Sequence, residues 1–401
     1  MVYRFGAMGV PRIRLVVFAF IASLFPACCT AQTHSGFPVD IVAGPPPQPV
    51  GSEGHTWLVY ELHLTNYAPL PIELTGVEVF GDAGTTLASY RGQELEKAVI
   101  AVEELASADS PSGFAGTRTL GEGHAAVMFI NLALEPGARQ PNELHHRFSF
   151  AVTRKNGEIL RRTVDGAVVP VVQEPLPVLA PPLRGSLWIA FNALSSADHR
   201  RSLNAIDGRE RIPQRFAIDW MQLGPDRRLF RGDKKSNADY YDYGAEVLAV
   251  ANGRVSDLQD GVPENSGSSE RSSRTVTIDN AVGNYVIIDL GRRRFALYAH
   301  LQPGSLRVKV GDKVSTGQVL ARLGNSGNSD EPHLHFQLMD SNSPLGSEGI
   351  PCEFASFTQV GIVNGQDSDL EAGQPWPPKN QATPLVHRRE FPFNKAVVTF
   401  P

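Results

Sequence analysis

Cysteine is scarce in this chain of 401 residues, which contains only three. Cys28 and Cys29 lie close to the N-terminus, so Cys352 has no partner in the rest of the sequence. A lone thiol cannot form an internal disulfide, and packing must therefore hold the fold together. For Cys352 we expect a small buried side chain rather than a nucleophile.

An excess of positive charge is also absent. The formal net charge is −5, so the composition gives no signature of a protein that binds polyanions. The basic clusters at residues 227–235 and 292–294 are short and typical of solvated turns. We therefore expect no nucleic acid among the partners of this protein.

Long hydrophobic runs are limited to one uncharged segment, residues 15–25, which follows Arg12 and Arg14. This run is too short to span a membrane but has the length of a signal-peptide core. We predict a signal peptide over residues 1–31, cleavage after Ala31, and export to the periplasm or the exterior. We favour cleavage over lipid attachment at Cys28, because residues 25–27 make a poor lipobox. No transmembrane segment is expected in the mature chain.

Helical periodicity is nearly absent, which argues against an α/β enzyme and predicts an all-β protein. The length favours two domains. Residues 32–55 predict an extended lead-in, and residues 56–174 contain alternating apolar runs separated by turn signals such as Asn156-Gly157. We interpret residues 56–174 as an antiparallel, immunoglobulin-like β-sandwich. Its expected strands cover 57–64, 72–79, 125–134, 147–153 and 164–172, with a short helix near 95–105.

A proline-rich segment, residues 175–184, follows the predicted sandwich. Its four prolines disfavour regular strand pairing and predict a semi-rigid linker. Residues 185–345 have short strands punctuated by glycine and predict a second, compact β domain. Residues 346–401 are expected to form a C-terminal extension that packs on the core of this domain.

The most informative feature of the second domain is the pair His333 and His335, which opens an apolar strand after a turn-rich loop. Successive side chains of a strand point to opposite faces, so these two histidines share one face. Two imidazoles that face one pocket suit a metal site, in which one binds the ion and the other transfers protons. An ordinary strand with two surface histidines would have the same local sequence.

Further motifs precede this strand in a fixed order, at residues 244–255, 283–289, 298–301 and 308–318. Together with His333-Leu334-His335 they resemble the lysostaphin/LytM-type zinc metallopeptidases, which are bacterial peptidoglycan endopeptidases with the duplicated hybrid motif fold. The resemblance covers roughly residues 185–345. It implies a LytM-type β-sheet core, a bound Zn²⁺ ion, and a substrate among the peptides of bacterial peptidoglycan.

The resemblance also implies roles for individual residues. A catalytic zinc ion takes three protein ligands and keeps a fourth position for water, which it activates for attack on an amide. The pattern of the family is a histidine, an aspartate four residues later, and the second histidine of His-x-His. Asp219 and His335 match the last two ligands. Proton-transfer and transition-state roles map to His333 and His300, which are not ligands.

The first ligand departs from the family pattern. Arg215 lies four residues before Asp219 and cannot bind a cation. The only histidine between residues 147 and 299 is His199. We favour His199 as the third ligand, because an otherwise intact set of aspartate and histidines is hard to explain without one. The alternative is that His199 is a loop histidine and that the site has lost a ligand.

The distance between His199 and Asp219 depends on the path of the chain. Asp207-Gly208 is a strong hairpin-turn signal. A hairpin centred there brings His199 opposite about Phe216, three residues short of Asp219, which leaves roughly 10 Å at about 3.3 Å per residue. His199 therefore reaches the metal only if the chain bends, and Pro213 is a candidate position for that bend.

We predict a secreted zinc-dependent metalloendopeptidase that cleaves peptidoglycan cross-links or stem peptides, and we expect residues 185–401 to carry the activity. An inactive family member, acting as a peptidoglycan-binding scaffold or hydrolase regulator, is the alternative. A biotinyl or lipoyl carrier domain is a third candidate, since residues 310–318 resemble its turn. The chain lacks a lysine in a Met-Lys-Met setting, which argues against a carrier. Zinc with hydrolysis would identify the peptidase, and zinc without hydrolysis the scaffold.

Overall fold

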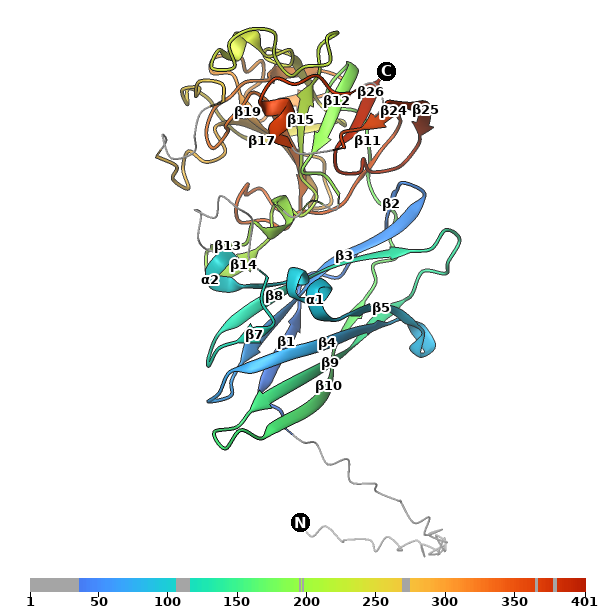
Figure 1. Cartoon of the computed structure of the whole chain (residues 1–401). Coiled ribbons are helices and arrows are strands. Elements are labelled where there is room, and N and C mark those ends of the chain that lie inside the picture. Colours follow the sequence, from blue (N-terminus) through green and yellow to red (C-terminus); the bar gives the residue numbers. More distant parts are fainter. Residues whose placement is uncertain are drawn as a thin grey trace, which may run out of the picture. The chain divides into compact units, whose positions relative to one another are not determined.

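The computed structural model describes residues 36–105, 116–194, 196, 198–268, 275–364, 367–377 and 381–401. Strands dominate this part of the chain and its helices are short (Figure 1), which confirms the all-β prediction. The signal peptide expected over residues 1–31 lies outside the described residues. Among those that are described, no helix combines the length and the apolar character needed to cross a membrane.

The first domain consists of two five-stranded antiparallel sheets (Figure 1). The order in the first sheet is β1 (Val39–Ala43), β3 (His55–Asn66), β8 (Ala125–Leu134) and β6 (Val99–Ala101), with β2 (Val50–Ser52) also paired to β3. The order in the second is β10 (Ile159–Pro170), β9 (Glu143–Thr153), β4 (Ile72–Phe80) and β5 (Thr86–Tyr90), with β7 (Thr119–Leu120) paired to β4. All five strands expected from the sequence overlap β3, β4, β8, β9 or β10. The immunoglobulin-like arrangement stays a prediction.

Residues 32–55 differ from the extended lead-in that the sequence suggests. Strands β1 and β2 lie in this range, and both pair with β3. The sandwich therefore begins ahead of Thr56. Prolines 45–47 lie between the two strands, where they interrupt pairing and make the short strands hard to recognise in the sequence.

The helix expected near residues 95–105 is interrupted. Helix α1 (Gly92–Ala98) is followed by strand β6 and then by the four-residue helix α2 (Val102–Leu105). The break falls on Val99 and Ile100, which are fully buried against β8. β-branched side chains pack well on a sheet, and here that packing prevails over continuation of the helix.

The proline-rich segment is a packed part of the second domain and not a bare linker. Within it, β11 (Val178–Leu179) pairs in parallel with β23 (Glu353–Phe354). Leu176, Leu179 and Leu183 are buried in the core of the second domain. The prolines reduce the number of backbone donors, but the leucines between them supply apolar side chains that anchor the segment.

The second domain is organised around a ten-stranded sheet. Its order is β20 (Lys313–Val314), β17 (Gly253–Gln259), β18 (Asn284–Asp289), β19 (Phe295–Leu301), β22 (Leu334–Met339), β15 (Ile218–Gln222), β12 (Gly185–Phe191), β26 (Ala396–Phe400), β24 (Phe357–Ile362) and β25 (Gln381–His387). The region 346–401, expected to pack on the core, thus contributes three strands to the sheet itself. Two small ribbons pair β13 (Asn204–Ile206) with β14 (Arg209–Arg211) and β16 (Glu246–Leu248) with β21 (Val319–Arg322). The remaining helical turns are η1 (Asp82–Gly84), η2 (His199–Arg201), η3 (Asn237–Asp239) and α3 (Asp367–Glu371).

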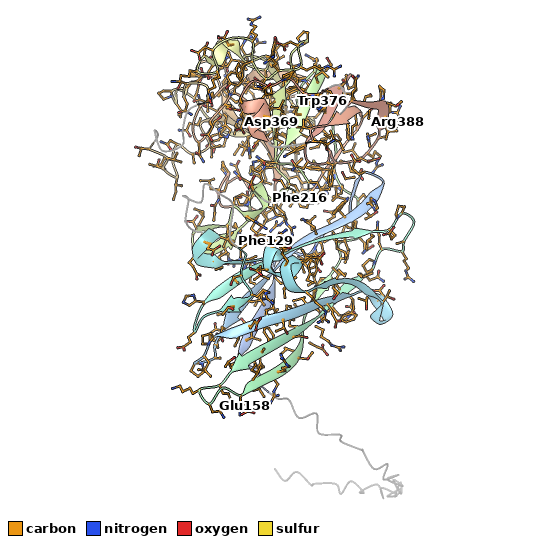
Figure 2. The ribbon with its side chains drawn as sticks, viewed as in Figure 1. Phe129, Glu158, Phe216, Asp369, Trp376 and Arg388 are labelled. Atoms are coloured by element: carbon orange, nitrogen blue, oxygen red, sulfur yellow. The ribbon has the colours of Figure 1, made fainter. Side chains whose placement is uncertain are left out.

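The core of the second domain also includes side chains from the sandwich. Val50 and Val59 are buried in the same cluster as Trp188 and Trp220. Phe216, labelled in Figure 2, belongs to this shared core and packs edge-on against Phe391, with ring centroids 6.2 Å apart. Cys352 is buried there too, as expected. Because apolar burial is the main stabilising force in folding, we expect the two domains to depend on each other for stability.

His146 gives the sandwich a pH-dependent stability. It lies buried between the two sheets, with Nε2 2.7 Å from the Tyr60 hydroxyl and Nδ1 2.6 Å from the Ala167 carbonyl oxygen. Burial lowers the pKa of His146 to about 4. The unfolded chain, with a histidine pKa of about 6.5, takes up a proton first as the pH falls. Stability is therefore complete above about pH 6.5 and is lost progressively toward pH 4.

We expect His146 to contribute about 3 kcal/mol to this acid destabilisation. In His146→Gln, the free energy of unfolding should depend less on pH over that window, because glutamine does not titrate. Urea unfolding at pH 7 and pH 4.5 measures the difference, with His145→Gln as the matched control, since His145 is the adjacent, partly exposed histidine. Equal pH dependence in His146→Gln and wild type would contradict this assignment.

Candidate metal centre

The pairing register of β15, β22 and β19 brings Asp219 and His335 together. Asp219 on β15 lies directly opposite His335 on β22, and Ala299 on β19 is the other neighbour of His335. Side chains of directly opposed residues in an antiparallel pair project from the same face. His335 Nδ1 accordingly lies 2.8 Å from Asp219 Oδ1. The sheet thus holds one carboxylate and one imidazole together on a rigid surface.

His199 reaches the same carboxylate from a helical turn. It begins the 3₁₀ turn η2, and its Nε2 lies 2.9 Å from Asp219 Oδ2. The hairpin expected at Asp207-Gly208 is present as β13–β14, but it covers only residues 204–211. The extended pairing that would set His199 opposite Phe216 is absent, because the chain turns at residues 199–201 and again at 213–216. The bend expected near Pro213 is therefore one of two.

His333 and His300 lie beside this group. His333 Nε2 is 3.5 Å from Asp219 Oδ1, and its Nδ1 is 2.8 Å from the carbonyl oxygen of Glu331. The His300 ring centroid is 4.7 Å from that of His333, and His300 Nδ1 is 2.8 Å from the carbonyl oxygen of Ser326. All five residues predicted from the sequence thus lie in one cluster.

His300 adopts an unusual backbone conformation. Its φ is +61° near the end of β19, where the regular pairing with β22 stops at Ala299. A non-glycine residue with positive φ costs about 1–3 kcal/mol, and such strain concentrates at functional sites. In an ordinary strand, residues 299 and 300 would point to opposite faces. The local twist instead brings the His300 ring into contact with His333 and His335.

The charges of the cluster are strongly coupled. Burial alone would raise the pKa of Asp219, but His199 and His333 lower it well below its usual value. Burial depresses the pKa of His199, and the nearby Asp219 carboxylate more than offsets this, so that the pKa is raised. Burial lowers the pKa of His333, and burial with the neighbouring His333 and His335 lowers that of His300 far below normal. His300 and His333 are therefore neutral imidazoles near pH 7.

The donor set fits zinc. One ligand atom from each of His199, Asp219 and His335 can be chosen so that all three lie within 4.8 Å of one another. Two imidazole nitrogens and one carboxylate are a donor set typical of catalytic zinc. A second group, His300, His333 and His335, meets the same distance limit. This second group has no carboxylate, and a carboxylate would offset the charge of a divalent cation.

Gln337 fixes the orientation of His335 for this purpose. Its Oε1 lies 2.8 Å from His335 Nε2, while its Nε2 faces the carbonyl oxygen of Pro344 at 3.5 Å. A carbonyl oxygen accepts, so His335 carries its proton on Nε2 and turns an unprotonated Nδ1 toward Asp219. In this tautomer the Nδ1 lone pair and the Asp219 carboxylate are both available to one cation. Metal-binding histidines commonly donate their second N–H in this way.

Sequence reasoning missed the supporting residues. Gln337 follows His335 by two residues and so shares its face of the strand, which could have indicated it. Asn192, just after β12, donates from Nδ2 to Asp219 Oδ2 at 3.0 Å. Its position is set by the pairing of Phe191 with Asp219 across β12 and β15. No local pattern in the sequence reveals that long-range pairing.

Comparison with known proteins identifies the domain. Residues 240–346 match the model of Peptidase family M23. This chain contains a Peptidase family M23 domain. The match includes His300, His333 and His335 but begins after His199 and Asp219. The match therefore does not test His199 and Asp219 as ligands, and their place beside His335 is known from the geometry of the cluster.

Two curated relatives each match a short part of this chain. The peptidoglycan DD-endopeptidase ShyA of Vibrio cholerae is 38% identical over 84 residues, which cover 19% of this chain and 19% of that protein. The endolysin 2638A of Staphylococcus phage 2638A is 35% identical over 88 residues, or 21% of this chain and 18% of the endolysin. The chain thus spans less than a fifth of the length of either relative.

Similar solved structures also carry M23 or lysostaphin-type domains. The catalytic domain of lysostaphin from Staphylococcus simulans is 23% identical with a TM-score of 0.20, and the match covers 31% of this chain and 86% of that one. The M23 protein EnpA from Enterococcus faecalis is 19% identical with a TM-score of 0.23, covering 45% and 90%.

Proposed function

We propose that this protein is an exported zinc metalloendopeptidase that cleaves peptide bonds in peptidoglycan cross-links or stem peptides. The observation that carries the proposal is the convergence of His199, Asp219 and His335, with the neutral His300 and His333 beside them. Export to the periplasm or the exterior follows from the signal peptide expected over residues 1–31. The family match supports the peptidase assignment.

Each residue would have a defined task in this reaction. His199 through Nε2, the Asp219 carboxylate, and His335 through Nδ1 would hold the ion. Bound zinc would supply a water molecule of lowered pKa. His333 and His300 each donate Nδ1–H to a backbone carbonyl, which leaves Nε2 unprotonated. Each ring can therefore accept a proton at Nε2 and, once protonated, donate it to the developing charge or to the leaving amine.

The substrate class rests on the relatives. Besides the peptidoglycan DD-endopeptidase, the glycyl-glycine endopeptidase ALE-1 of Staphylococcus capitis is 35% identical over 72 residues. Both names describe hydrolysis of peptide bonds, and the first places them in peptidoglycan. We infer the same class of substrate for this chain.

The function is tested with the mature chain, residues 32–401, and purified peptidoglycan. We expect release of new amino groups, which a chelator should stop and added zinc should restore. Asp219→Asn is the inactive control, because it removes the central carboxylate charge while keeping nearly the same shape. Zinc-loaded, folded protein that binds peptidoglycan but releases no amino groups would instead identify a scaffold or a regulator.

The ligand role of His199 gives a separate prediction. We expect about one zinc ion per chain in the wild type, and a large loss of zinc from His199→Ala, because a site with two remaining protein ligands binds poorly. Elemental analysis of dialysed protein measures the zinc content. His145→Ala is the matched control, since this partly exposed histidine lies outside the cluster. Full zinc retention in His199→Ala would remove His199 from the ligand set.

A further inference from the structure

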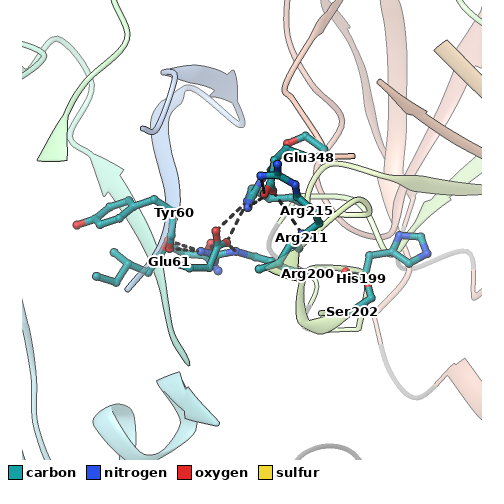
Figure 3. A network of polar contacts seen from close by, with 12 residues as sticks. Tyr60, Glu61, His199, Arg200, Ser202, Arg211, Arg215 and Glu348 are labelled. Atoms are coloured by element: carbon teal, nitrogen blue, oxygen red, sulfur yellow. Dashed lines mark hydrogen bonds and ion pairs between the residues drawn. The ribbon is translucent and has the colours of Figure 1, made fainter. Parts of the chain in front are cut away.

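A buried ion network joins the sandwich to the segments that carry the candidate ligands (Figure 3). At its centre is Glu61 on β3, which is fully buried. Its carboxylate accepts from Arg200 Nε at 3.1 Å and from Arg215 Nε at 2.9 Å. Arg200 directly follows His199, and Arg215 lies four residues before Asp219. One carboxylate of the first domain thus contacts both parts of the second domain that lead to the metal centre.

Four hydrogen bonds join the Arg200 guanidinium to the sandwich. Besides Glu61, it donates to the carbonyl oxygens of Tyr60 at 2.6 Å and Ile130 at 2.7 Å, and to Asn131 Oδ1. These acceptors come from β3 and β8. The guanidinium is planar with donors in fixed directions, so several acceptors around it determine its position closely.

The turn that presents His199 needs such an anchor. A three-residue 3₁₀ turn has too few hydrogen bonds to be stable alone. Arg201, on the other side of Arg200, donates to the carbonyl oxygen of Lys97 in α1 at 2.8 Å. In Figure 3 the His199 ring projects away from the guanidinium of Arg200. The turn therefore has its two arginines fixed in the sandwich and its histidine directed at Asp219.

Arg215 joins the segment before Asp219 to the same Glu61 carboxylate. It occupies the position where the resembled family has its first ligand. Its guanidinium also donates to Glu348 Oε2 at 2.9 Å and to the carbonyl oxygen of Gly349 at 3.0 Å. Arg215 thus binds Glu61 of the sandwich and not the metal. The missing imidazole is supplied by His199, on the turn that the same Glu61 anchors through Arg200.

We infer that Glu61 is a positioning residue of the metal centre: through Arg200 it fixes the turn that brings His199 to Asp219. The sandwich is then an integral part of the site and not a spacer, since the third ligand is ordered by a carboxylate from the first domain. This inference rests on the proposed zinc function. The inference adds that the sandwich, through Glu61, holds the His199 ligand in place. The M23 domain alone does not contain this carboxylate.

The test uses the mature chain with two measurements, zinc affinity by chelator competition and hydrogen exchange of residues 198–203 in metal-free protein. We expect Glu61→Gln to bind zinc about 10–100-fold more weakly, the usual cost of losing a group that orients a ligand. Exchange at residues 198–203 should also become faster. Arg200→Lys keeps the buried positive charge but loses the planar fork, and it should change both measurements in the same direction. This second variant is used if Glu61→Gln does not fold.

Glu348→Gln is the matched control. It removes another buried carboxylate from the same network, on the Arg215 side and away from Arg200. Its zinc affinity and its exchange at residues 198–203 should change less than those of Glu61→Gln, because Glu348 bonds to Arg215 and Arg211 and the bonds of Arg200 to the sandwich stay intact. Wild-type behaviour of both Glu61→Gln and Arg200→Lys would overturn the inference, as would an equal weakening in Glu348→Gln. A wild-type protein that binds no zinc would refute the proposed function, while the exchange measurement would still decide the role of Glu61.

Discussion

Replacement of His333 by alanine is expected to leave zinc bound and to slow peptidoglycan hydrolysis by about 10²–10⁴-fold, the usual contribution of a general acid or base. The reason is geometric. His335 Nδ1 lies 2.8 Å from Asp219 Oδ1 and belongs to the group with His199, whereas His333 Nε2 is 3.5 Å from the same oxygen. His333 is neutral because burial lowers its pKa, so it can accept a proton near pH 7.

Zinc content and hydrolysis rate must be measured on the same preparation of His333→Ala. His300→Ala should behave in the same way, because His300 also keeps a neutral imidazole beside the cluster. His335→Ala is the matched comparison on the same strand, and it should lose the metal. If His333→Ala lost its zinc and His335→Ala kept it, the roles of the two strand histidines would be the reverse of those proposed.

Removal of the first domain and the proline-rich segment is expected to abolish cooperative folding of the rest. A chain that begins at residue 185 lacks Leu176, Leu179 and Leu183, all of which are buried in the core of the second domain. It also loses Val50 and Val59 from the same apolar cluster, and the Glu61 carboxylate that binds Arg200 and Arg215. Domains are typically stable by only about 5–15 kcal/mol. The sequence predicts activity in residues 185–401, and the structure leads us to the opposite expectation.

Two truncated chains separate these contributions. Residues 175–401 restore the buried leucines but not Glu61, so this chain should be more stable than residues 185–401 and less stable than residues 32–401. Thermal unfolding followed by circular dichroism compares the three. A sharp, cooperative transition of residues 185–401 at the same temperature as the full mature chain would show that the two domains are independent.

The parts of the fold that were predictable depend on local patterns. Alternating apolar residues located β3, β4 and β8, because one buried face is enough to specify a strand. Strand β6 was missed, since a three-residue strand between two short helices has no period of its own. The proline-rich segment predicts a linker because its prolines dominate the pattern, whereas its leucines pack in the core.

The site was predictable to the extent that its residues lie in motifs. His333 and His335 are two residues apart, and the alternation of a strand places them on one face. The approach of His199 to Asp219 depends on two turns that have no distinctive sequence signal. Glu61 is 139 residues from Arg200 in the sequence, so nothing local connects a strand of the sandwich to the metal centre.

The central claim is that His199, Asp219 and His335 hold the zinc ion, and a crystal structure of the zinc-loaded mature chain tests it most directly. Anomalous differences at the zinc absorption edge locate the metal independently of the protein atoms. We predict one peak about 2.0–2.2 Å from His199 Nε2, an Asp219 carboxylate oxygen and His335 Nδ1. The alternative group in this cluster is His300, His333 and His335. A peak bound by those three histidines, with His199 turned away, would contradict the account.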